Sequence, residues 1–149
     1  MNEKIRLLLI YEILGRPPEH IVESLTSLIK SIGENSGITI IKNKIHEPHP
    51  INETANEKSV NSPNLFSTFA EVEMEVDNLS IVFQIVMNTL PSSIDIISPS
   101  EMTLKNFDLN NLLSDLILKL HKYDEVAKTI LLEREKFNDE LRKRGNKNL

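Results

Sequence analysis

Residues able to do chemistry gather in two short segments of this chain, GRPPEH at residues 15–20 and HEPHP at residues 46–50. Imidazole and carboxylate groups are ligands that zinc uses in proteins. Each segment follows an apolar, strand-like run, so the two approach one another if those strands run parallel in one sheet. The prolines extend the second segment and leave no tight ligand spacing, so we predict no metal site. The alternatives left open are simple turn residues and an edge that contacts a partner or ligand, formed by Arg16, His20, His46, Glu47 and His49.

The segment GRPPEH also invites an anion-binding interpretation, because free backbone N–H groups at a helix N-terminus bind phosphate. Pro17 and Pro18 remove two of those donors, and Glu19 already places a negative charge in the first turn. We therefore expect Gly15 to turn the chain, the prolines to begin a helix, and Glu19 to complement the helix dipole.

Motifs that carry enzymatic chemistry are missing from the sequence. It has no P-loop, no HExxH and no nucleophile elbow, and it has no cysteine for thiol catalysis or disulfides. We expect no catalytic residues, no cofactor and a non-enzymatic role.

The order of elements predicts an α+β fold. Apolar runs at 5–14 and 37–45 and the alternating run at 66–76 indicate strands, as does 93–98. Helical spacing of apolar residues fills 17–33 and 79–90. The order βαββαβ is that of a ferredoxin-like sandwich, which we assign to residues 1–107, with residues 52–64 as a mobile loop.

The last third of the chain predicts one long helix, from residue 108 to residue 144, with a disordered tail at 145–149. Apolar residues recur there at alternating steps of four and three, which is the heptad pattern of a coiled coil. The first half is apolar over a wider arc, so we expect it to pack on the domain while the second half pairs with another helix. The seam runs through Leu109, Leu113, Leu116 and Leu120, and its distal part, the predicted oligomer interface, is Tyr123, Ala127, Ile130, Arg134, Phe137 and Leu141.

The βαββαβ order, with GRPPEHIVESLTSLI after the first strand and FAEVEMEVDNLSIVFQIV in the second half, resembles the small-molecule-binding ACT domains. The resemblance implies an α+β sensor module over about two-thirds of the chain. Residues 15–18 read Gly-Arg-Pro-Pro, whereas ACT domains carry an acidic residue and Pro-Gly at this turn. The whole chain also resembles small archaeal proteins with YEILGRPPEH and HEP segments, which implies no particular activity.

Charge argues against a nucleic-acid-binding sheet. The net charge is −5, and Glu71, Glu73 and Glu75 alternate along the third main strand, where RNA-binding sheets place stacking aromatics. We expect these carboxylates to pair with Arg6, Lys42 and Lys44 across the sheet. A possible nucleic-acid contact remains in the basic end of the chain, at Arg142, Lys143, Arg144 and Lys147, although cations there also suit the helix dipole.

Together these features predict a homodimeric assembly or regulatory factor that binds a larger protein or ribonucleoprotein. The rivals are a ribosome- or RNA-associated factor and an ACT-like sensor. No apolar run reaches membrane length, so we expect a cytoplasmic protein with neither a membrane nor DNA as partner.

Overall fold

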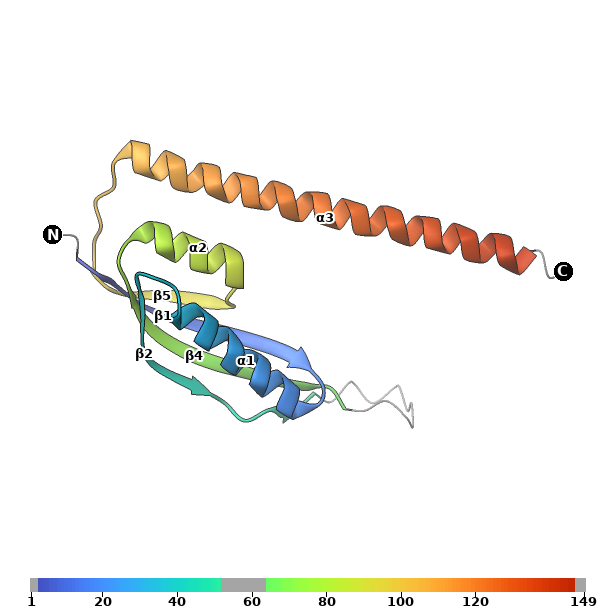
Figure 1. Cartoon of the computed structure of the whole chain (residues 1–149), viewed down its shortest axis with the longest axis horizontal. Coiled ribbons are helices and arrows are strands. Elements are labelled where there is room, and N and C mark those ends of the chain that lie inside the picture. The colour runs from blue at the N-terminus through green and yellow to red at the C-terminus, as the bar shows by residue number, and fades with distance from the viewer. Residues whose placement is uncertain (1–2, 52–63, 147–149) are drawn as a thin grey trace. The chain divides into compact units, whose positions relative to one another are not determined.

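The computed structural model describes residues 3–51 and 64–146 and confirms the predicted α+β fold (Figure 1). The segment predicted to be a mobile loop, 52–64, lies outside these residues apart from Asn64. The elements are β1 (Ile5–Gly15), α1 (Pro18–Gly33), β2 (Ile38–Ile45), β3 (His49–Pro50), β4 (Phe66–Val76), α2 (Leu79–Thr89), β5 (Ser93–Ser98) and α3 (Asn106–Asn146). The very short β3, inside HEPHP, is an addition to the predicted order. The chain divides into two compact units, Met1–Thr103 and Leu104–Leu149.

The first unit is built on one antiparallel sheet with the order β2-β4-β1-β5, and β3 pairs with β4. Since β1 and β2 both run antiparallel to β4, they run parallel to each other, as the ferredoxin-like arrangement requires. The C-terminal end of β1 and the HEPHP segment therefore both lie beside the beginning of β4. Gly15 is level with Phe66, and so is Pro50 on the other side of that strand.

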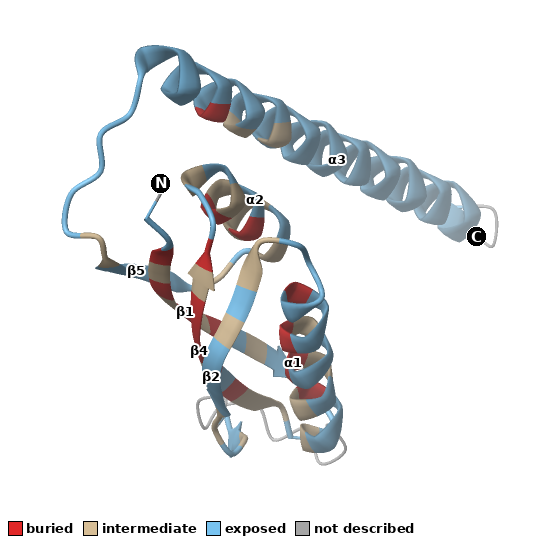
Figure 2. Cartoon of the chain, turned by 60° about the vertical axis from the view of Figure 1, so that its left-hand side comes forward, coloured by how far each residue is buried: buried red, intermediate tan, exposed pale blue. Residues whose placement is uncertain are grey.

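One face of the sheet carries the core, as the alternation along β1 and β4 predicts (Figure 2). Both helices contribute apolar residues to this core, so α1 and α2 cover the same face. Its fully or nearly fully buried members include Leu7, Leu9, Val72 and Met74 from the strands, and Leu25, Ile29, Val82 and Ile85 from the helices. The opposite face of the sheet bears the charged residues of β1, β2 and β4.

Local signals explain the ends of the two short helices. Pro18 is the first residue of α1. A backbone N–H at this position would have no hydrogen-bond partner within the helix, so proline costs nothing there. Asn78 caps α2, since its side-chain oxygen accepts a hydrogen bond of 3.0 Å from the Ile81 N–H. Leu90 ends that helix in the left-handed conformation with φ of 49°. The Arg16–Pro17 peptide bond is cis.

Glycine is required at residue 15 by a close contact and not by a left-handed backbone conformation. Among the described glycines a positive φ occurs at Gly37, not at Gly15. A Cβ atom on Gly15 would instead lie 2.7 Å from Cγ2 of Ile21, a residue that is buried in the first turns of α1. Gly15 is therefore needed for the close approach of β1 to α1.

The second unit consists mainly of α3, a single helix of 41 residues without a break near residues 121–124. It begins two residues before the predicted Asp108, and it includes Gly145 and Asn146, which the sequence places in a disordered tail. At 1.5 Å per residue such a helix is about 60 Å long.

Candidate functional site

The distal seam of α3 is an exposed apolar stripe. Tyr123 is 40 % exposed, Ile130 58 %, Phe137 62 % and Leu141 51 %, and Ala127 and Arg134 between them are exposed as well. Because residues at heptad spacing share one side of a helix, these side chains form a continuous surface. Large contiguous apolar patches are uncommon on monomeric proteins and mark interaction sites.

The seam extends toward the beginning of α3 through Leu109, Leu113 and Leu120, which are also exposed, and through Leu116, which is half-buried. Among the described residues, no helix combines the length and apolar character needed to cross a membrane.

Charged side chains lie beside the middle of this seam. Lys128 Nζ lies 2.7 Å from Asp124 Oδ2, one turn away on the same helix. Lys119 Nζ lies 5.7 Å from the centre of the Tyr123 ring. Such contacts are worth only a few tenths of a kcal/mol on an exposed helix, but they bias the positions of the charges that flank the seam.

The basic end of the chain is a second exposed feature of α3. Its last turns carry three exposed cations, Arg142, Lys143 and Arg144. Positive charge at the C-terminal end of a helix interacts favourably with the helix dipole. Lys147, the fourth residue of this group, lies outside the described residues. The three placed cations are accessible to a polyanion, and the dipole alone also accounts for them.

The structure brings some of the residues predicted to form an edge at the ends of β1 and β2 close to one another. His49 lies beside Ser67 at the start of β4, and Leu14 lies beside Ser67 on its other side. Arg16, Glu47 and His49 are exposed, and His20 is exposed in the first turn of α1 with its backbone N–H bonded to Pro17. Within residues 3–51 and 64–146, no three His, Asp or Glu side chains are placed to hold a metal ion. The edge is thus a polar, accessible surface.

His46 differs from the other residues of that edge because it belongs to the charged face of the sheet. Its ring stacks on Phe69, with 3.9 Å between centroids and 19° between planes. Its Nε2 is 2.9 Å from Oε2 of Glu71, and its carbonyl oxygen accepts a hydrogen bond from Thr68 Oγ1. The sequence prediction missed this contact, although the strand register would place His46 near Phe69. His46 is therefore held by the sheet rather than presented by a turn.

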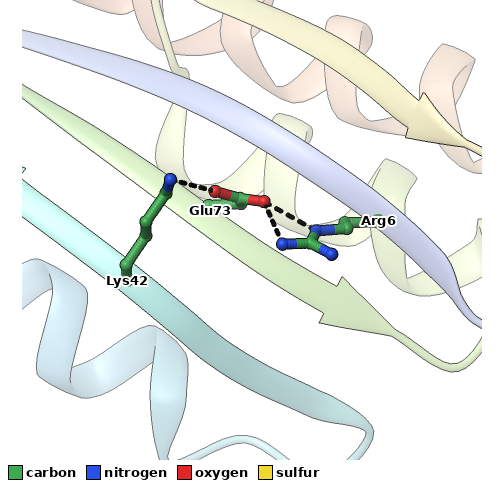
Figure 3. Close-up of polar contacts among 3 residues, drawn as sticks. All are labelled: Arg6, Lys42 and Glu73. Carbon is green, nitrogen blue, oxygen red and sulfur yellow. Dashed lines mark hydrogen bonds and ion pairs between the residues drawn. The ribbon is translucent and has the colours of Figure 1, made fainter.

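Glu73 is the centre of the charged sheet face (Figure 3). Its Oε1 accepts from Arg6 Nε at 2.6 Å, with Arg6 Nη2 also at 2.6 Å, and its Oε2 lies 3.1 Å from Lys42 Nζ. These cations hold the pKa of the Glu73 carboxyl below its usual value, chiefly through the contact with Lys42 and then that with Arg6. Pairing of Glu73 with Arg6 and Lys42 follows the sequence prediction, whereas Glu71 pairs with His46 rather than Lys44. Two cations of this face, Arg6 and Lys42, are therefore engaged by Glu73.

A groove of about 340 Å³, which no sequence pattern predicts, lies between α2 on one side and the end of α1 with the turn that follows it on the other. Ile38 and Ile85 contribute apolar surface, and Asn35, Gln84 and Asn88 contribute amides. Thr89, also in its wall, shares a hydrogen bond of 2.7 Å with the hydroxyl of Tyr11, whose pKa is raised by burial. Among the residues that the structure describes, those lining the groove are all uncharged, so they offer no ionic anchor to a ligand.

Comparison with models of known protein families places the chain in one of them. The MJ0538 family matches residues 6–145. The chain belongs to the MJ0538 family. No curated protein matches it, and no solved structure matches it. Membership fits the resemblance to small archaeal-type proteins, whereas the ACT-like resemblance gains no support.

The family match covers both units of the chain and not the sheet domain alone. Of the candidate residues, only Lys147 falls outside it. The match therefore extends along α3 as far as Gly145.

Proposed function

We propose that this MJ0538-family protein is a homodimeric, non-enzymatic assembly or regulatory factor. The observation that carries the proposal is the exposed seam of α3, in particular Tyr123, Ile130, Phe137 and Leu141. A helix gains most of its stability in water from packing of an apolar face, so a face this long and apolar requires a partner. The heptad period favours a second helix as that partner.

A second copy of the chain is the simplest source of that helix. It brings an identical seam, and two-fold homodimers are the commonest soluble oligomers. The paired helices leave the sheet domains as the surfaces that meet a larger protein. The exposed edge residues Arg16, His20, Glu47 and His49 supply charge and hydrogen-bonding groups for that contact.

A pull-down from native extract tests the partner contact. Immobilised wild-type chain is compared with a variant in which Arg16, His20, Glu47 and His49 are changed to Ala. A protein retained by the wild type in the presence of nuclease, and lost with the variant, is the expected result. Equal retention by both chains contradicts the role of this edge.

An RNA- or ribosome-associated factor is the second candidate, favoured by the exposed Arg142, Lys143 and Arg144. It predicts recovery of ribosomal particles that nuclease abolishes, RNA binding that weakens steeply with salt, and loss of both on changing these cations to Ala. In either case we expect the sheet face around Glu73 to stay free of RNA. Chemical-shift changes on β4 upon adding RNA would show otherwise.

A further inference from the structure

We propose that the two copies of α3 pair antiparallel, with Leu109 of one chain beside Leu141 of the second copy. The inference rests on the proposed homodimer and specifies its geometry. In this register the whole seam of each chain overlaps the whole seam of the other, and every a position faces a d position. The first half of the seam then faces the second copy instead of its own domain, which is the partner that the width of the apolar arc predicts. The layers are Leu109 with Leu141, Leu113 with Phe137, Leu116 with Arg134, Leu120 with Ile130 and Tyr123 with Ala127, each occurring twice.

Side-chain size favours this arrangement over a parallel pair in register. In the parallel pair Ala127 faces Ala127 and Tyr123 faces Tyr123, which leaves a thin layer next to a thick one. In the antiparallel pair the smallest seam residue faces one of the largest. Large against small is the arrangement that fills a helix interface at the density of a protein interior.

Arg134, the one charged seam residue, also favours the antiparallel pair over the parallel pair. A parallel pair in register brings the two guanidinium groups into one layer, where like charges repel. The antiparallel pair sets each Arg134 against Leu116 of the second copy. The apolar stem of the arginine then packs on the leucine while its charged end reaches water.

The flanking charges are complementary in the antiparallel register. Lys119 lies beside Glu133 of the second copy, an exposed carboxylate. In the parallel pair its flanking partner is Asp124, which Lys128 already neutralises at 2.7 Å. The two Asp124 side chains approach the two-fold axis of the antiparallel pair, and each brings Lys128 as its counter-ion.

Disulfide trapping tests the orientation, because the chain has no cysteine of its own. Leu113→Cys and Phe137→Cys chains are prepared separately, shown by sedimentation to dimerise, and oxidised alone and as an equal mixture. The antiparallel pair predicts a linked dimer in the mixture only, since the two copies of residue 137 lie about 36 Å apart along the axis. Linked dimers from either chain alone overturn the inference, as does a dimer that is not linked in any sample. A monomeric wild type instead contradicts the homodimer on which the inference rests.

Leu120→Cys with Ile130→Cys repeats the test should a Phe137 variant fail to pair, with the same expected result. Charge exchange then checks the register. Lys119→Glu and Glu133→Lys should each weaken the dimer roughly 2- to 30-fold, two pairs being lost per dimer, and the double exchange should restore it. A double variant that stays as weak as the single variants overturns the register.

Discussion

Charge placed in the distal seam of α3 should separate the dimer into folded monomers. The perturbation is Ile130→Asp combined with Phe137→Asp. Both residues are well exposed in the single chain, at 58 % and 62 %, so the substitutions remove no packing from the domain core. Their cost falls on the helix–helix contact.

The exposed fractions set the magnitude of this effect. Burial of a whole Ile or Phe side chain is worth about 1.5–3 kcal/mol, and about three-fifths of each side chain remains to be buried in the dimer. Four such side chains, two from each copy, contribute about 4–7 kcal/mol. At 1.4 kcal/mol per factor of ten, the dissociation constant rises by roughly 10³ to 10⁵. A micromolar dimer would thus become monomeric at any usual concentration.

Sedimentation velocity with circular dichroism measures the outcome. We expect the double variant to sediment as a monomer and to keep the sheet signal of the domain. Leu132→Asp is the matched control, because Leu132 is 59 % exposed, lies two residues from Ile130 and points away from the seam. This control should remain dimeric. A dimeric double variant, or a control that dissociates equally, refutes the reasoning.

Three further predictions concern the sheet domain. Because the pKa of Glu73 is lowered in the folded protein, its ionised form stabilises the fold above its ordinary value of 4.5, and this stabilisation is lost as pH falls through the lowered value. Glu73→Gln should therefore be less stable than wild type in urea at neutral pH, and this difference should shrink as the pH falls below 4.5; a difference independent of pH contradicts the ion-pair account. Gly15→Val should cost about 1–3 kcal/mol by crowding Ile21, with Gly15→Ala milder, as thermal unfolding would show, and an unchanged melting temperature for both removes the packing argument. Arg16→Ala and His20→Ala should each change stability by less than about 0.5 kcal/mol and leave the dimer intact, and a monomer from either would place the dimer contact at this edge instead of in α3.

Much of the fold follows from the sequence because its local signals agree with one another. The alternation at residues 66–76 predicts β4 to the residue, and Pro18 and Gly33 bound α1 as expected. The seam of α3 also follows from spacing alone, since heptad positions share a side of any continuous helix. These features depend on residues close in sequence.

Features that depend on contacts distant in sequence escaped prediction. The stacking of His46 on Phe69 depends on the register of β2 against β4, and the groove between α1 and α2 depends on how two helices diverge over a sheet. The requirement for glycine at residue 15 arises from the position of Ile21, which backbone preferences do not reveal. The helix α3 continues two residues past its predicted end, because Gly145 terminates a helix only when the following residues favour another conformation.

Analytical ultracentrifugation of the wild-type chain tests the central claim most directly. Sedimentation equilibrium at tens of micromolar, a concentration chosen on the usual affinity scale, reads the mass independently of shape. A homodimer has twice the 17.0 kDa of one chain, and this is the mass that we expect. A mass of one chain at that concentration would contradict it, because the seam of α3 would then not hold two copies together.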